Sequence, residues 1–108
     1  MNDKIEKFEC LKVLAEMKHR YAHEGFILRG LFGSFARNDF DEMSDIDLAY
    51  EIEQEVFFKN YEGFRAVSRI AEICNELEVA FGRKVDLFSL NSKNSDFIDE
   101  IKREMIDA

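Results

Sequence analysis

The chain has 108 residues, of which 46% are hydrophobic and 13% aromatic, and this composition predicts one ordered domain spanning residues 1–108. Its 23 Asp and Glu residues outnumber 15 Lys and Arg residues and give a net charge of -8, which argues against direct binding to nucleic acid, because affinity for a phosphate backbone comes mainly from Lys and Arg. The chain has no run of 18 apolar residues and no basic-then-apolar leader, so we expect no membrane span, no secretion and a cytoplasmic location.

The first part of the chain is predicted to form a helix, a strand and a helical turn. Apolar residues recur every three or four positions over residues 3–22, which predicts an amphipathic helix ending near Gly25. This apolar stripe consists of Ile5, Phe8, Leu11, Leu14, Met17 and Tyr21. The segment FILRGLFG, residues 26–33, is expected to be a short strand whose glycines allow a ligand or another backbone to come close. Residues 34–37 follow as the first turn of a short helix.

A second strand and a long helix are predicted in the middle of the chain. Residues 45–52 alternate acidic and apolar side chains at first, which is the period of a strand with one face on the core. Residues 57–81 have helical spacing and predict one helix, which Gly82 ends. The apolar positions of this helix are Phe57, Tyr61, Phe64, Val67, Ile70, Cys74, Leu77 and Phe81.

The last part of the chain is predicted to add one strand and one helix. Residues 84–90 are apolar on both faces except for Asp86, as in a buried central strand. Either Ser95 or Asp96 can cap a final helix. One side of that helix carries Phe97, Ile101 and Met105. The predicted order is therefore α-β-(short α)-β-α-β-α, an α/β (α+β) fold with helices flanking a small mixed sheet.

Five carboxylates crowd into the nine residues from 39 to 47 and need either full solvation or a cation, because like charges that close repel one another. They are Asp39, Asp41, Glu42, Asp45 and Asp47. The first three are expected to face solvent in a connecting loop. The other two lie two residues apart on a strand, so they project from the same face and can bind a hard cation.

Asp86 is the candidate third carboxylate of this site. A lone acid in an apolar strand would be buried without a partner at a cost of several kcal/mol, so either Asp86 meets a cation or the strand prediction is wrong. Magnesium takes few protein ligands together with the phosphate oxygens of a substrate, and a pair of magnesium ions stabilises both the attacking and the leaving oxygen in phosphoryl or nucleotidyl transfer. The three acids therefore predict a magnesium site for such a transfer.

The Gly33-Ser34 turn is the candidate phosphate site. A helix that starts after a glycine offers free backbone N–H groups to an anion, and the Ser34 hydroxyl adds a donor. Arg37 lies one turn later, where its guanidinium is expected either to contact a phosphate or to pair with an acid of the loop. Gly33, Ser34 and Arg37 are therefore the candidate phosphate-binding residues.

These motifs together resemble the nucleotidyltransferase superfamily of the DNA polymerase β type. The resemblance rests on Gly33-Ser34, on Asp45-Ile46-Asp47 after ten intervening residues, and on the apolar-Asp-apolar strand at Val85-Asp86-Leu87. The segments LFGSFAR and SDIDL in a chain of this length are similar to the minimal nucleotidyltransferases, the MNT antitoxins that are paired with HEPN toxins. The resemblance covers residues 26–90 in sequence and the flanking helices in length and order.

The resemblance implies a nucleotidyltransferase fold and a role for each motif residue. Asp45, Asp47 and Asp86 would bind magnesium, and Asp86 would also activate the attacking hydroxyl. Gly33 and Ser34 would hold the phosphates of the nucleoside triphosphate. Antitoxins of this group resemble adenylyltransferases that move AMP from ATP to a tyrosine of the partner HEPN ribonuclease, so the implied cofactor is Mg²⁺, most simply as two ions, and the implied partner is a HEPN toxin.

Two other functions remain open at this stage. The chain could neutralise a toxin only by binding it, with a vestigial site, since an acidic surface complements a basic RNA-binding face and larger relatives carry an accessory helical domain that 108 residues do not hold. It could also modify a cationic small molecule, as the aminoglycoside nucleotidyltransferases do. His19 and His23 are expected to be solvated, and Cys10 and Cys74 to be ordinary thiols packed in the interior.

Overall fold

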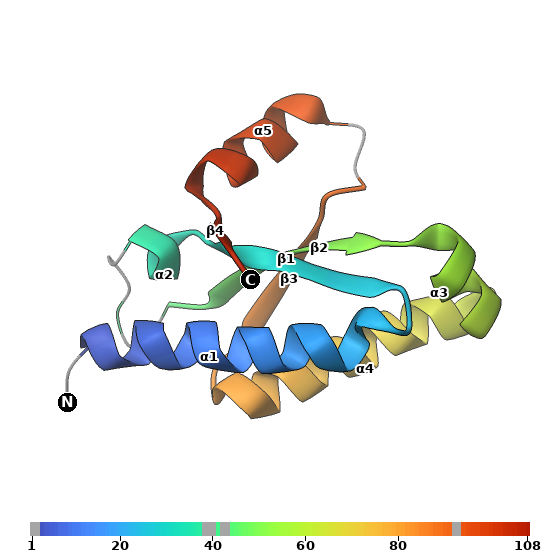
Figure 1. Ribbon diagram of the computed structural model, residues 1–108, viewed down its shortest axis with the longest axis horizontal. Coiled ribbons are helices and arrows are strands. Elements are labelled where there is room, and N and C mark those ends of the chain that lie inside the picture. The colour runs from blue at the N-terminus through green and yellow to red at the C-terminus, as the bar shows by residue number, and fades with distance from the viewer. Residues whose placement is uncertain (1–2, 38–40, 42–43, 92–93) are drawn as a thin grey trace.

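The computed structural model describes residues 3–37, 41, 44–91 and 94–108, with side chains from residue 8 onward. These residues form one sheet flanked by helices (Figure 1). In chain order the elements are α1 (Asp3–Ala22), β1 (Phe26–Phe32), α2 (Ser34–Arg37), β2 (Ile46–Ile52), α3 (Gln54–Asn60), α4 (Phe64–Phe81), β3 (Val85–Ser89), α5 (Ser95–Glu104) and β4 (Ile106–Asp107). The predicted α/β class is confirmed. None of the helices within the described ranges is both long and apolar enough to cross a membrane.

The sheet is mixed and has the strand order β3-β2-β1-β4. Strand β1 runs antiparallel to β2 and to β4, whereas β2 and β3 are parallel. The sequence did not predict β4, which pairs only Asp107 with Gly30 and Ile106 with Leu31. The prediction of β3 as a central strand is wrong, because β3 forms one edge of the sheet and only Val85 in it is fully buried. The side chains of β3 are apolar because helices cover both faces of the strand, with Val85 and Leu87 in one core cluster and Phe88 in the other. They do not indicate that a strand is paired on each side.

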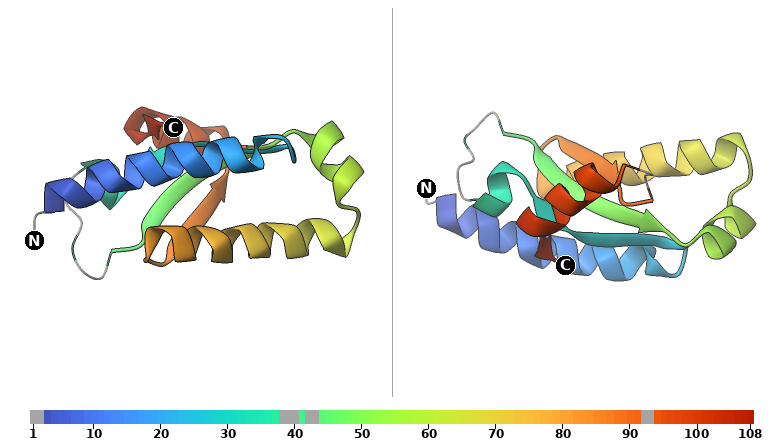
Figure 2. Two further views of the ribbon diagram at one scale, coloured as in Figure 1. Left: turned by 60° about the horizontal axis from the view of Figure 1, so that its bottom comes forward. Right: turned by 90° about the horizontal axis from the view of Figure 1, so that it is seen from above.

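The two faces of the sheet carry separate apolar clusters. Helices α1 and α4 lie side by side on one face, and α5 lies on the other (Figures 1 and 2). The larger cluster joins α1 and α4 to the first face through residues such as Leu14, Leu48 and Ile73. The smaller cluster packs Ile101 of α5 against Phe32 and Ala49. Side chains alternate along a strand, so Asp47, two residues before Ala49, is on the α5 face of β2.

The predicted single helix over residues 57–81 is divided in the structure. Helix α3 ends at Asn60, whose side chain donates to the carbonyl of Val56, and Tyr61 then adopts extended backbone angles (φ -135, ψ 112). This break allows the Tyr61 hydroxyl to donate to Glu24, at the end of α1, over 2.7 Å. Periodicity does not report such a break, because Phe57 and Ile70 still pack against the same core.

Three apolar side chains that the helical spacing assigned to the core are exposed. Phe8 is 76% exposed, Phe64 is 91% exposed and Val67 is 67% exposed. The buried positions are Cys10, Leu14, Met17 and Tyr21 in α1 and Ala66, Ile73 and Leu77 in α4. At about 100° per residue, Phe64 and Val67 point away from the face that buries Ala66. Phe8 likewise lies outside the buried stripe of α1. The predicted core position of Ile5 lies outside the described side chains.

Several smaller predictions have clear outcomes. Helix α5 begins one residue earlier than expected, because the Asn94 side chain, rather than Ser95 or Asp96, accepts a hydrogen bond from the backbone N–H of Phe97. Both cysteines are thiols; Cys10 is buried and Cys74 is half-buried. His19 and His23 are exposed, as predicted.

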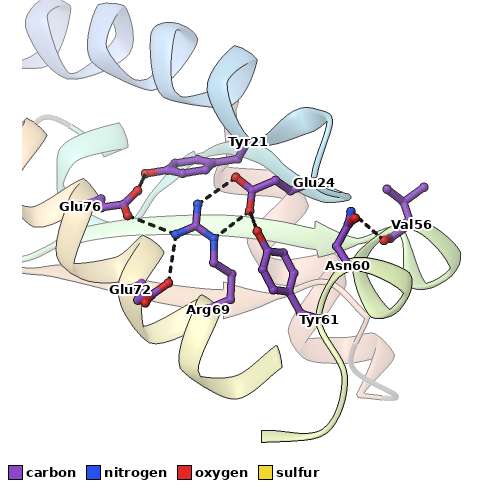
Figure 3. Close-up of polar contacts among 8 residues, drawn as sticks. All are labelled: Tyr21, Glu24, Val56, Asn60, Tyr61, Arg69, Glu72 and Glu76. Carbon is purple, nitrogen blue, oxygen red and sulfur yellow. Dashed lines mark hydrogen bonds and ion pairs between the residues drawn. The ribbon is translucent and has the colours of Figure 1, made fainter. Parts of the chain in front are cut away.

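A polar network ties the C-terminal end of α1 to α3 and α4 (Figure 3). The Arg69 guanidinium binds both carboxylate oxygens of Glu24, through Nε at 2.7 Å and Nη2 at 2.8 Å, and it also contacts Glu76 at 3.1 Å. The Tyr21 hydroxyl donates to Glu76 over 2.6 Å. The hydrogen bonds from Arg69 hold the pKa of Glu24 below its usual range. Only 14% of the Arg69 side chain and 12% of Glu24 are exposed, so this network is a polar part of the interior.

Replacing Arg69 by Ala is expected to lower the free energy of unfolding by about 3 kcal/mol, because Glu24 would keep its charge in a nearly buried position without its partner. Arg65→Ala, at an exposed position of the same helix, should change stability by less than about 0.5 kcal/mol. Urea unfolding of both variants at pH 7 measures the difference. Equal losses for Arg69→Ala and Arg65→Ala would show that the network contributes no stability.

Candidate active site

The Gly33-Ser34 turn lies between β1 and α2, as predicted. Gly33 has φ +74, a left-handed backbone angle that residues with a side chain rarely adopt. Its carbonyl accepts the backbone N–H of Arg37 at 3.1 Å, which closes the single turn of α2. Phe35 is fully buried and anchors this turn to the core. The turn therefore has a fixed position at the end of β1.

Gly33 lies directly against the carboxylate of Asp47. A Cβ atom added to Gly33 would overlap the Asp47 Oδ2 atom. The neighbouring residue Phe32 is the register partner of Asp47 in the β1–β2 pair, so the sheet itself holds the turn and this carboxylate together. The two motifs that the sequence placed 14 residues apart thus form one site.

The sheet also brings two of the three predicted site carboxylates together. Asp47 and Asp86 are register partners in the parallel pair of β2 and β3, and Asp45 lies just before β2. All three are half-buried. Asp86 is on the α5 face of β3, because Val85 and Leu87 belong to the opposite core cluster. The strand prediction for Asp86 holds, and the residue is at the sheet edge beside a second acid.

Negative charge exceeds positive charge around the Asp47 carboxylate. Burial, followed by the charges of Asp86 and Asp45, raises the pKa of Asp47 to about 6, and the charge of Arg37 opposes this shift. An acid with this pKa is stabilised by any cation that comes close. The donors suit Mg²⁺, which prefers carboxylate oxygens. In their present side-chain positions, however, no three His, Cys, Asp or Glu residues of the described ranges converge as a ready-made metal cluster.

Arg37 pairs with an acid that sequence reasoning did not identify. Its Nη1 atom lies 2.5 Å from Oε1 of Glu104, the last residue of α5. The prediction left open a phosphate or an acid of the loop after Arg37, and the observed acid comes from the other end of the chain. A carboxylate in the last turn of a helix is disfavoured by the helix dipole, so a nearby cation stabilises it. The position of Glu104 at the end of α5 was therefore the signal in the sequence that could have indicated such a pair.

Asp41 and Ser44, which lie between α2 and β2, are held by Arg83, two residues before β3. Arg83 Nη1 donates to the backbone carbonyls of Asp41 at 2.9 Å and Ser44 at 3.0 Å, and its guanidinium lies 5.0 Å from the centroid of the Phe35 ring. Asp41 is exposed, as predicted for a loop acid. The predicted solvation of Asp39 and Glu42 concerns positions outside the described residues. Arg83 was not predicted, because nothing in its local sequence indicates contacts to a segment 40 residues earlier.

Comparisons with known sequences lead to one family. The family model described as "Polymerase beta, Nucleotidyltransferase" matches residues 17–106. A protein of Methanocaldococcus jannaschii, named as a candidate protein adenylyltransferase, is 31% identical over 105 residues, which cover 89% of this chain and 98% of the relative. A second protein of that organism with the same kind of name is 34% identical over 78 residues, covering 72% of this chain and 74% of the relative.

A comparison with solved structures agrees. One structure, described as that of a candidate minimal nucleotidyltransferase, superposes with a TM-score of 0.68 and 27% sequence identity. The match covers 98% of this chain and 95% of the other. The strand arrangement that holds Gly33, Asp47 and Asp86 together therefore belongs to a fold already seen in a protein of that description.

Proposed function

This chain belongs to the Polymerase beta nucleotidyltransferase family, and on that premise we propose that it transfers AMP from ATP to a tyrosine hydroxyl of a partner HEPN toxin. The observation that carries the proposal is the contact between Gly33 and the Asp47 carboxylate, with Asp86 as the register partner of Asp47. A phosphate turn and two strand acids are what a nucleotidyltransferase needs at one place. The names of the two relatives support a protein as the acceptor.

In the proposed reaction the acceptor hydroxyl oxygen forms a bond to the α-phosphorus of ATP, and the bond from that phosphorus to the departing pyrophosphate breaks. Asp86 accepts the proton of the hydroxyl. Asp45, Asp47 and Asp86 would hold Mg²⁺, which when bound neutralises charge on the reacting phosphate. Gly33 and Ser34 position the phosphates, and Arg37 binds one of them through its guanidinium.

Electrostatics support a protein partner of basic character. The chain has a net charge of -8, so association with a positively charged RNA-binding surface would be fast and favourable. Such a surface is expected on a ribonuclease toxin, and adenylylation of a tyrosine there would silence it. This combination of chemistry and charge supports the role of antitoxin.

One observation favours a binding-only antitoxin as the second candidate. The net charge of -8 would let the chain occupy a basic face of a toxin without any chemical step. Under this alternative the acidic surface alone would occupy the toxin. The two candidates differ in whether the partner gains mass.

Incubation with ATP and Mg²⁺ is expected to add one or more AMP units to the HEPN protein encoded beside this chain, as measured by intact-mass spectrometry. A metal chelator should abolish the gain, because the three carboxylates would then lack the cation that joins them to the phosphates. Parallel reactions with GTP, CTP and UTP define the nucleotide preference. A tight complex with no gain in mass under any condition would favour the binding-only antitoxin.

A further inference from the structure

An ion pair lies beside the candidate active site. Arg37 ends α2, Glu104 ends α5, and their side chains meet at 2.5 Å. The Arg37 side chain is 51% exposed and that of Glu104 is 33% exposed, so solvent and solutes can reach both. The pair links the phosphate turn to the helix that covers the site-bearing face of the sheet. We refer to it as the Arg37–Glu104 bridge.

The bridge belongs electrostatically to the site. The charge of Arg37 lowers the pKa of Asp47, whereas the charge of Glu104 raises it, so both groups are close enough to act on the same carboxylate. Glu104 is thus a fourth acid beside Asp45, Asp47 and Asp86. A nucleotide that enters must bring its triphosphate close to this negative charge, and Glu104 already binds the cation that could offset it.

Glu104 also has a fixed place. Ile101, one turn earlier in α5, is buried against Phe32 and Ala49, and β4 after the helix pairs with β1. The backbone of Glu104 is therefore held beside the site, and its carboxylate can move only as far as its own side chain allows. Arg37 has a long flexible side chain on a half-exposed turn, so it is the partner that can exchange one anion for another.

We propose that Glu104 competes with the nucleotide for Arg37, so that the Arg37–Glu104 bridge opens when the triphosphate binds. The proposal rests on the proposed function, because it assigns Arg37 to a phosphate in the loaded state. A triphosphate carries several negative charges and the bridge is a half-exposed pair, so the exchange favours the nucleotide. Glu104 thereby sets the affinity of the site for nucleotide without contacting the reacting atoms.

Glu104→Gln tests this competition, because it removes the charge and keeps the shape. We expect the variant to bind ATP in the presence of Mg²⁺ about two- to fivefold more tightly than the wild type in isothermal titration calorimetry, the range of a half-exposed ion pair. Glu100→Gln, at an exposed acid one turn earlier on the same helix, measures the effect of lost negative charge alone. In an Arg37→Ala background, Glu104→Gln should tighten binding clearly less than it does with Arg37 present, because only the direct repulsion between the Glu104 charge and the phosphates is then removed.

Equal effects of Glu104→Gln and Glu100→Gln, or a tightening by Glu104→Gln that is just as large without Arg37 as with it, would overturn the proposal. Glu104→Ala provides a second variant that must shift affinity in the same direction, and thermal unfolding checks that each protein is folded. The outcome is separable from that for the proposed function. If the wild type binds ATP but never adds AMP to a partner, the transfer is refuted while the affinity comparison still decides whether the bridge competes. If the wild type binds no ATP, both are overturned.

Discussion

Asp47→Asn is expected to reduce AMP transfer by about a thousandfold or more, because several kcal/mol of transition-state stabilisation depend on the metal that the strand carboxylates hold. Asp47 is central to the site: it touches Gly33, pairs in register with Asp86 and follows Asp45 by two residues. The measurement is the initial rate of AMP incorporation into the partner protein. Asp99→Asn, at an exposed acid of α5, is the matched control and should leave the rate unchanged.

The same Asp47→Asn variant is expected to be more stable than the wild type when metal is removed by a chelator. The pKa of Asp47 is raised to about 6 by burial and by its acidic neighbours, so the ionised group opposes folding at pH 7. Discounted for solvent screening, the gain should be about 1 kcal/mol, or a Tm higher by roughly 4 °C.

The pH dependence follows from the direction of this shift. The folded protein holds the Asp47 proton more tightly than the unfolded chain does, so wild-type stability recovers as the pH falls through about 6. The advantage of Asp47→Asn should therefore narrow between pH 7 and pH 5. An inactive variant with no gain in stability at pH 7 would show that Asp47 is compensated by other groups in the absence of metal.

The motif residues could be predicted from the sequence because each depends on local geometry. The glycine at position 33 marks a left-handed turn, and the alternation around Asp47 marks a strand face. Parallel pairing then places Asp86 beside Asp47, which requires only that the two strands be neighbours. The turn depends on one glycine, and the two strands are short segments in which side chains alternate between the two faces.

The remaining features depend on contacts between distant segments. Glu104 meets Arg37 across 67 positions of the chain, and Arg83 reaches the carbonyl of Asp41 across 42. Helical spacing identified a stripe that includes Phe64, but the face of α4 that packs on the sheet is the one carrying Ala66, Ile73 and Leu77. The position of the sheet decides which face of the helix is buried, and the apolar spacing of the helix alone does not contain that information.

Gly33→Ala is expected to lower the free energy of unfolding by about 3 kcal/mol and to reduce transfer at least about a hundredfold. Part of the loss is the left-handed backbone, which costs a residue with a side chain roughly 1–2 kcal/mol. The remainder comes from overlap of the new methyl group with the Asp47 carboxylate, which must turn away from its place beside Asp86. A displacement of about 1 Å in a reacting group is enough for a hundredfold loss.

Gly82→Ala separates these two contributions. Gly82 has φ +69, close to the angle at Gly33, but nothing lies within 4 Å of an added Cβ atom there. Its substitution should therefore show the backbone cost alone and leave transfer intact. In an Asp47→Ala background the overlap with the carboxylate is removed and only a close contact of 3.3 Å with the Cβ atom of residue 47 remains, so the stability loss from Gly33→Ala should fall toward that of Gly82→Ala in urea unfolding. A loss that is unchanged in that background would mean that the backbone angle, rather than contact with the carboxylate, is what requires glycine at position 33.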